Sequence, residues 1–186
     1  LWVWSPIQLT DTLAAQVSSL GEVCHLVSPN KIHHLFLQDW QSRFPDAQLW
    51  GPASTIKKRA DLQFEGALTD DAPAAWQGAI ESLWFRGSFA MDEVVFFHNT
   101  SRTVIIADLS ENFSDHFLQT HWGPIARFVA RLWKIKQPWG YAPLELRLSW
   151  LKRAAARERL RKLLAWQPQQ VVMAHGEWQS SEASTY

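Results

Sequence analysis

The chain has 186 residues with 18 basic and 18 acidic side chains, and 47% of its residues are apolar. This length fits a single domain with a substantial core, and the composition excludes general disorder. The formal net charge of zero argues against partners such as nucleic acid or an anionic membrane. Because Cys24 is the only cysteine, an internal disulfide and a multi-cysteine zinc site are excluded. No apolar run is long enough to span a bilayer.

The chain begins inside a predicted strand at residues 1–4, without an initiator methionine or a leader. We therefore expect an N-terminally trimmed domain, and a targeting segment could have been lost with the trimmed part. The cytoplasm is the expected compartment.

Helical and strand patterns alternate along the first half of the chain. Helical spacing of apolar residues alternates with short β-branched runs, and Gly, Pro and Asn lie at the boundaries. In order, the pattern predicts a helix over 11–20, a strand over 22–27, a helix over 31–44, a strand over 47–50 and a short helix over 54–60.

The second half continues this alternation after a polar segment without clear periodicity. The pattern predicts strands over 80–85, 93–98, 103–109 and 171–174, with a hairpin between the second and third of them. Helical stretches are predicted over 112–136, with a break at 123–124, and over 148–166, with Leu151, Ala155, Leu160, Leu163 and Leu164 facing inward. Residues 180–186 read as a flexible tail. Together these elements predict one α/β layered domain over 1–186.

Chemistry-bearing residues gather where three predicted strands end. His33 and His34 follow the strand over 22–27, Asp108 ends an apolar strand, and His175 ends another. If the three strands shared one sheet, these side chains could meet at one edge. Imidazole and carboxylate together suit a divalent ion such as zinc, iron or manganese.

Each of these residues also has an ordinary structural explanation. A histidine pair at a helix start is commonly surface decoration, and an aspartate after a strand commonly caps a turn. A strand-end histidine before a glycine is commonly structural. These explanations remain open beside the metal site.

The order of these segments resembles the metallo-β-lactamase superfamily, and more closely a bacterial and plant-plastid branch of that fold whose function is unknown. The resemblance covers nearly the whole chain and is carried by residues 1–7, 25–30, 33–34, 93–98, 101–109 and 172–176. It implies a four-layer αβ/βα sandwich, with two sheets between outer helices.

The resemblance also implies which ligands are retained and which are missing. In the superfamily motif H-x-H-x-D-H, the first two histidines fall on Pro29 and Lys31, the aspartate on His33 and the closing histidine on His34. The family's mid-chain histidine has no counterpart near residues 87–90. Asp108 matches the bridging aspartate, and His175 matches the final histidine.

This pattern implies one metal ion in place of the usual pair. His33, His34, Asp108 and His175 are its candidate ligands, with Asp108 and His33 as candidate catalytic residues. Zinc is expected first, iron or manganese next, and the alternative is no metal at all. In addition, Lys31 is a candidate for binding an anionic substrate group.

A further candidate lies within a predicted strand rather than at its end. Glu93 alternates with apolar neighbours in the strand over 93–98. It could face the site as a substrate-binding, positioning or acid/base group. A solvent-facing position fits the same alternation equally well.

Three functions remain open. The first is a single-metal hydrolase acting on a small ester, amide, thioester or phosphoester. The second is a catalytically inactive ligand- or protein-binding module, and the third is an iron-dependent oxidoreductase. The expected partner is a small molecule rather than nucleic acid or membrane. The 12 tryptophans also suggest a homo-oligomer contact, because aromatic residues are enriched at interfaces.

Overall fold

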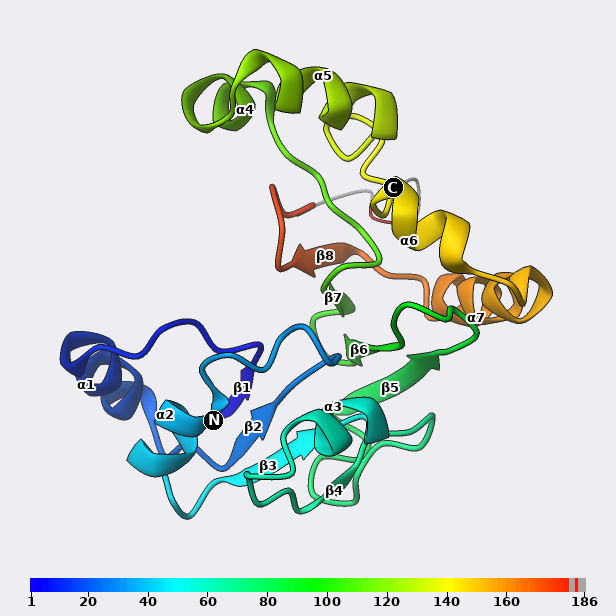
Figure 1. Ribbon diagram of the computed structural model, residues 1–186. Coiled ribbons are helices and arrows are strands. Elements are labelled where there is room, and N and C mark those ends of the chain that lie inside the picture. Colours follow the sequence, from blue (N-terminus) through cyan, green and yellow to red (C-terminus); the bar gives the residue numbers. More distant parts are fainter. Residues whose placement is uncertain (181–182, 184–186) are drawn as a thin grey trace. The chain divides into compact units, whose positions relative to one another are not determined.

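The computed structural model describes residues 1–180 and 183 and divides into two compact units (Figure 1). Unit 1 comprises Leu1–Thr69 and unit 2 comprises Asp70–Tyr186. The single domain over 1–186 stays a prediction. The predicted tail lies outside the described residues, except for Ser180 and Ala183.

Unit 1 alternates short strands and helices around one parallel sheet. Its elements are β1 (Trp2–Trp4), α1 (Asp11–Leu20), β2 (His25–Val27), α2 (Leu37–Arg43), β3 (Gln48–Gly51), α3 (Ala53–Lys58) and β4 (Gly66–Ala67). The sheet order is β1-β2-β3-β4, and every neighbouring pair is parallel. Parallel neighbours need a crossover, and α1, α2 and α3 supply the connections. As a result, the carboxyl ends of all four strands lie at one edge of the sheet.

Two helix boundaries of unit 1 follow from local hydrogen bonds. Thr10 caps α1, because its Oγ1 accepts from the Leu13 N–H at 3.1 Å. By contrast, α2 begins at Leu37 and not at residue 31 as predicted. The Asn30 side chain accepts the N–H groups of Ile32 and His33, at 2.8 and 3.2 Å. Beyond this cap-like turn, the His34 N–H donates to the Ile32 carbonyl at 3.0 Å, a bond tighter than the helical one, and the helical ladder begins only at Leu37.

The core of unit 1 lies between its sheet and the helices that follow the strands. Leu26 of β2 and Leu49 of β3 pack with Leu37 and Trp40 of α2, and all four are buried. The Trp40 indole N–H is satisfied by the Ile7 carbonyl at 2.8 Å. The loop after β1 is thereby tied to α2.

Unit 2 is built on a mixed sheet. Its elements are β5 (Ile80–Phe85), β6 (Glu93–His98), β7 (Thr103–Ile106), α4 (Asp115–His121), α5 (Pro124–Trp133), α6 (Leu144–Ser149), α7 (Arg153–Ala165) and β8 (Gln170–Met173). The order is β5-β6-β7-β8, with antiparallel pairs except for the parallel pair β7–β8. The predicted hairpin between β6 and β7 and the predicted helix break before α5 are both confirmed.

The predicted helix over 148–166 is wrong at its start, because two helices replace it. α6 ends at Ser149 and α7 begins at Arg153. The backbone between them pairs elsewhere: Trp150 forms a bridge with Ser88, and the Leu151 N–H donates to the Gly87 carbonyl at 3.3 Å. These long-range partners replace the helical hydrogen bonds.

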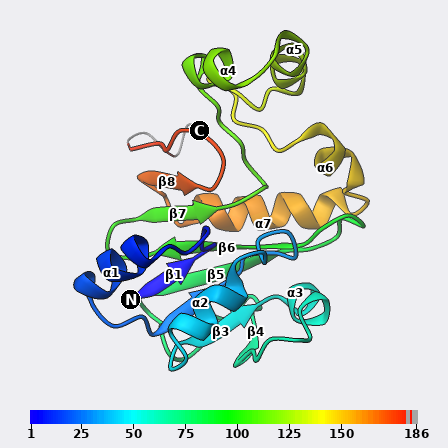
Figure 2. The same cartoon turned by 60° about the vertical axis from the view of Figure 1, so that its left-hand side comes forward.

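The prediction of which residues of this helix face inward is also mostly wrong. Leu163 is buried at 9% exposure, but Leu151, Leu160 and Leu164 are 75%, 50% and 46% exposed, and Ala155 is exposed as well. Figure 2 shows α7 running along the sheet of unit 2. Because α7 begins only after the interruption, the face it turns to the sheet differs from that of one continuous helix.

The core of unit 2 joins α7 to all four strands. Leu163 packs with Leu83 of β5, Phe97 of β6, Val104 of β7 and Val171 of β8. Helices α4 and α5 close over a smaller apolar cluster of their own. Among the described residues, no helix is both long and apolar enough to cross a bilayer.

The packing predicts a sharp contrast between two phenylalanines of unit 2. Phe96, in the sheet interior on β6, has no exposed surface, whereas Phe89 is 74% exposed. Phe96→Ala should lower the free energy of unfolding by about 3–5 kcal/mol, because it leaves a cavity in a close-packed interior. Phe89→Ala should change it by less than about 0.5 kcal/mol. Urea denaturation measures both, and equal effects would contradict the packing.

Candidate functional site

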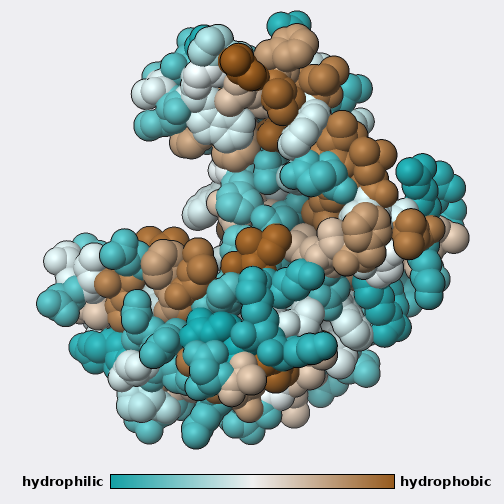
Figure 3. Space-filling view, in the orientation of Figure 1, coloured by the Kyte–Doolittle hydropathy of each residue, from teal (hydrophilic) through white to brown (hydrophobic). Residues whose placement is uncertain are grey.

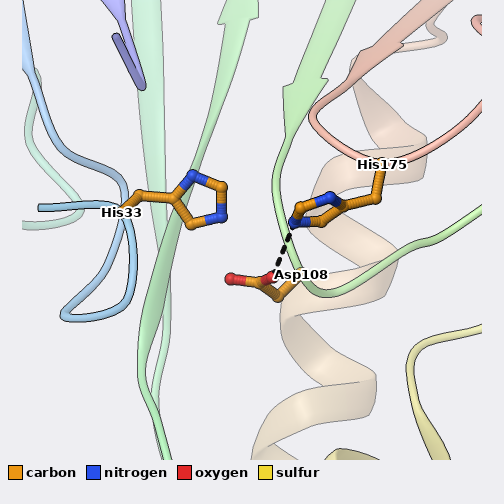
Figure 4. A group of neighbouring side chains, drawn as sticks. All are labelled: His33, Asp108 and His175. Carbon is orange, nitrogen blue, oxygen red and sulfur yellow. Dashed lines mark hydrogen bonds and ion pairs between the residues drawn. The ribbon is translucent and has the colours of Figure 1, made fainter. Parts of the chain in front are cut away.

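Strand register brings Asp108 and His175 together in unit 2. Ile106 of β7 pairs with Met173 of β8, and the Ala174 N–H donates to the Ile106 carbonyl at 3.1 Å. Asp108 and His175 each lie two residues beyond this pair, so both emerge at the same edge of the sheet. His175 Nε2 lies 3.1 Å from Asp108 Oδ1, in hydrogen-bonding contact (Figure 4).

A buried carboxylate on β6 holds the turn that carries Asp108. Glu93 has no exposed surface. Its Oε1 accepts from the Ala107 N–H and its Oε2 from the Asp108 N–H, both at 2.8 Å. Such charge-assisted bonds compensate for burying the charge. Direct contact of Glu93 with a substrate stays a prediction, and the contacts described are those of a positioning residue.

The loop after β8 is held by Asn112. The Asn112 N–H donates to the His175 carbonyl at 3.0 Å, and the Glu177 N–H donates to the Asn112 carbonyl at 2.8 Å. Gly176 lies between them with φ +108°, and a Cβ there would sit 2.3 Å from the Asn112 carbonyl. Only glycine allows this close approach, so Gly176 is a requirement of the loop that follows His175.

The carboxylates around His175 change the protonation of this cluster. The hydrogen bond that the protonated His175 imidazole donates to the Asp108 carboxylate raises the pKa of His175 above its usual value, against the opposing effect of burial. Burial raises the pKa of Glu111 to about 7, and the nearby charges of Asp108 and Glu145 add to this effect. Glu111 therefore changes protonation near neutral pH, as a general acid or base must.

Sequence reasoning missed Glu111. Its only sequence signal is its place three residues after Asp108, which is too common an arrangement to single it out. The burial that raises its pKa arises from tertiary packing.

In unit 1, neutral hydrogen bonds shape the loop after β2. Ser28 Oγ bonds the carbonyl oxygens of Asn30 and His33 at 2.9 and 2.7 Å. Ser28 and Asn30 are both fully buried. These bonds form a turn directly after β2, and this turn fixes the backbone of His33.

His33 and His34 have different surroundings although they are adjacent. Ser5 Oγ lies 2.5 Å from His33 Nδ1, and the Trp4 ring stacks on the His33 imidazole with a centroid distance of 6.5 Å. Because Nδ1 has a partner, Nε2 is the nitrogen suited to bind a metal ion.

His34 lies beside cations. Its pKa is lowered by burial first and then by the charges of Lys58 and Arg59. Arg59 Nη1 also donates to the His34 carbonyl at 2.9 Å. In the same loop, partly buried Lys31 accepts a hydrogen bond at its carbonyl from Lys58 Nζ at 3.1 Å. This cationic environment keeps His34 neutral but disfavours an additional positive ion.

The three strand ends do not share one sheet, which was the condition for their side chains to meet at one sheet edge. The loop bearing His33, His34 and Lys31 follows β2 in the parallel sheet of unit 1, whereas Asp108 and His175 follow β7 and β8 in unit 2. Within unit 2, the structure does bring two predicted residues into contact.

The Asp108–His175 pair fits a metal ion in both chemistry and spacing. Two ligand atoms bound to zinc at about 2.0–2.1 Å in tetrahedral geometry lie roughly 3.3 Å apart. The distance of 3.1 Å between Oδ1 and Nε2 is close to this value. A carboxylate oxygen and an imidazole nitrogen also suit zinc, iron or manganese.

Two solved structures with a similar fold are metallo-β-lactamases. The crystal structure of DIM-1 metallo-β-lactamase exposed to ceftazidime is similar over 91% of this chain and 68% of its own, with 16% identity and a TM-score of 0.56. A structure of TMB-1, solved for insight into substrate and inhibitor binding, is similar over 90% of this chain and 67% of its own, with 14% identity and a TM-score of 0.55. No protein-family model and no curated protein matches the sequence. The predicted α/β fold of the metallo-β-lactamase type is confirmed.

The close approach at Gly176 predicts a large effect of one added methyl group. Gly176→Ala should destabilise the protein by about 3 kcal/mol or more, because a positive φ and a backbone clash with Asn112 act together. Gly123→Ala is the control: Gly123 has φ −68° as the cap of α5, and nothing lies within 4 Å of its Cβ position. It should cost less than about 1 kcal/mol. Thermal and urea unfolding measure both variants, and similar losses would contradict this geometry.

The raised pKa of Glu111 predicts stability that falls with pH. The neutral carboxyl group stabilises the folded state below its usual pKa of 4.5, and this contribution disappears as the pH rises to about 7. We expect a loss of roughly 1–2 kcal/mol over that interval, after allowance for solvent screening. Glu111→Gln should remove this part of the slope.

Urea denaturation between pH 4.5 and 8 in EDTA measures this slope. The raised pKa of His175 acts in the same direction above pH 6.5, and most of its part should persist in Glu111→Gln, because the hydrogen bond with Asp108 is its largest cause and the charge of Glu111 a smaller one. The exposed Glu158, which pairs with Lys162 on α7, provides the control Glu158→Gln. Parallel curves for the wild type and Glu111→Gln would show that Glu111 titrates normally.

Proposed function

We propose that this chain is a metal-dependent hydrolase with one divalent ion, held by His33, Asp108 and His175. The observation that carries the proposal is the Asp108–His175 pair at the ends of β7 and β8, whose spacing suits two ligands of one ion. The metallo-β-lactamase-like fold supports it. Each of the three residues offers one ligand atom, and two imidazoles with one carboxylate leave a divalent ion with one positive charge.

His34 is the weaker candidate among the four predicted ligands. The cations Lys58 and Arg59 that lower its pKa also oppose a metal ion beside it. The same charges suit Lys31 and its neighbours for an anionic substrate group, as predicted from the sequence. His34 is therefore proposed to contribute little to metal affinity.

A single bound ion would polarise a carbonyl or phosphoryl oxygen and lower the pKa of a water molecule. The other residues have distinct roles in the proposal: Glu93 positions Asp108, and Glu111 holds or releases a proton near neutral pH. The substrate class is a small ester, amide, thioester or phosphoester. Zinc is the first choice of ion, and the cytoplasm is the proposed compartment.

The binding module remains the second candidate. Proline and lysine occupy two positions where the superfamily motif has histidines, Pro29 and Lys31. Such a loss accompanies the disappearance of catalysis as readily as a change to one metal ion. An iron-dependent oxidoreductase would use the same ligands as the hydrolase, and the identity of the bound metal separates these two.

Metal content by mass spectrometry tests the proposal directly. Tag-free wild-type protein should contain about one equivalent of zinc, iron or manganese. His33→Ala, Asp108→Ala and His175→Ala should each lower retention at least tenfold after dialysis, because each removes a ligand of one ion. His34→Ala should retain nearly all of the metal.

His116→Ala, on the exposed surface of α4, controls for adventitious binding to histidine. Circular dichroism establishes that each variant is folded. A folded wild-type protein that stays free of metal after reconstitution would overturn the proposed hydrolase and leave the binding module as the remaining candidate. Loss of metal in His34→Ala, but not in His33→Ala, would exchange the roles of the two histidines.

A further inference from the structure

An apolar groove of about 510 Å³ lies in unit 2 between the sheet and helices α6 and α7. We call it the α6–α7 groove, and its floor is formed by Phe85, Ile106 and Leu109. Pockets that bind small molecules have volumes of about 300–1,000 Å³. Ile106 and Leu109 pack against the core of unit 2 but remain only partly buried. The groove therefore leaves apolar surface uncovered where the core ends.

Apolar side chains of α7 and of the segment between α6 and α7 form the walls. Trp150 stands at the edge of the Phe85 ring, with centroids 6.5 Å apart and an interplanar angle of 88°. Ala156 and Leu160 of α7 complete the wall, and Leu160 is 50% exposed. Figure 3 shows apolar surface over α6 in this part of unit 2. A ligand with an apolar chain would cover this surface, and the removal of that surface from water would favour binding.

The charged groups that line the groove are all cationic. They are Arg147, Arg153 and Arg157, and no carboxylate is among its described lining residues. Arg147 is engaged within the protein: its Nη2 donates to the Trp133 carbonyl at 2.7 Å, and its guanidinium lies over the Tyr141 ring at 5.4 Å.

Two of these arginines have no partner among the described residues. Arg153 and Arg157 are exposed, four residues apart on one face of α7, and neither forms an ion pair or a side-chain hydrogen bond there. On the same helix, Arg159 pairs with Asp70 at 2.8 Å. Two adjacent like charges repel each other, and an anion placed between them relieves that repulsion.

We propose that the α6–α7 groove binds the anion of a medium-chain fatty acid. The chain lies on Phe85, Ile106 and Leu109, and the carboxylate meets Arg153 and Arg157. An apolar floor beside two unpaired arginines matches both ends of such a ligand, whereas an uncharged chain or a cation would match only one. This inference goes beyond the proposed hydrolase, since no part of it depends on a bound metal.

Calorimetric titration of the full chain with decanoate tests the proposal. Decan-1-ol and decylamine, with the same chain, supply the neutral and cationic comparisons. We expect one decanoate bound per chain, with clearly weaker binding of both comparison ligands. Arg153→Gln/Arg157→Gln should weaken binding about tenfold, the size expected when two exposed charge pairs are lost. Arg161→Gln, an exposed position on α7 outside the groove, should leave the affinity unchanged.

A second pair of variants tests the location. Ala156→Phe fills the groove and should abolish binding, while Ala154→Phe, on the same helix but outside the groove, should leave it intact. Thermal unfolding establishes that the variants are folded, and the arginine variant alone keeps the proposal testable if Ala156→Phe is not. Absence of decanoate binding would overturn the proposal. So would equal affinity for decan-1-ol, or insensitivity to the arginine or Ala156 substitutions.

The same titration in EDTA, and with His175→Ala, separates this proposal from the proposed hydrolase. Decanoate should bind with unchanged affinity in both. A protein without metal that binds decanoate would overturn the hydrolase alone, and a metal-containing protein that does not bind decanoate would overturn the groove alone.

Discussion

The buried carboxylate of Glu93 is the interaction on which the candidate site of unit 2 depends. Removing a charge from water costs several kcal/mol unless hydrogen bonds compensate for it, and here two backbone N–H groups, from Ala107 and Asp108, provide that compensation at 2.8 Å each. The two bonds stabilise both partners, because the amides satisfy the buried Glu93 side chain and Glu93 fixes the backbone where β7 ends. Asp108 thus leaves the sheet at a defined angle, and its contact with His175 follows from strand register.

Three carboxylates around one imidazole give this site an excess of negative charge. The charges of Asp108, Glu111 and Glu93 all raise the pKa of His175, and Asp108 in turn disfavours ionisation of Glu111. Without a cation, the cluster lowers its charge by retaining protons, which is what the raised pKa values describe. A divalent ion would serve the same purpose and would favour the ionised carboxylates. Proton retention and metal binding are thus two alternative ways of neutralising the negative charge of this cluster. This need for neutralisation comes from the carboxylates around His175 and not from the resemblance to any family.

The sequence predicted elements well where local signals and tertiary packing agree, and poorly where a distant partner decides. Strands β5 and β6 have the predicted bounds, because their apolar and aromatic residues are followed closely by residues that favour turns, Gly87 and Asn99. The break between α6 and α7 was not predicted, because it depends on a β-bridge between Trp150 and Ser88, which lies far away in the sequence. The same distinction holds for the site. Asp108 and His175 were identifiable as strand-end residues, but the pKa of Glu111 depends on burial and on charges brought near by folding.

The two histidines of unit 1 show why residue type alone does not define a ligand. His33 and His34 are adjacent in sequence, yet Ser5 orients one imidazole while Arg59 and Lys58 place positive charge beside the other. The loop after β7 in unit 2 shows the same contrast, because two consecutive residues there have different surroundings. Asp108 contacts His175, whereas the next residue lines the α6–α7 groove. One short turn held by a buried carboxylate therefore supports a polar cluster and the floor of an apolar groove, so a disturbance of that turn should affect both.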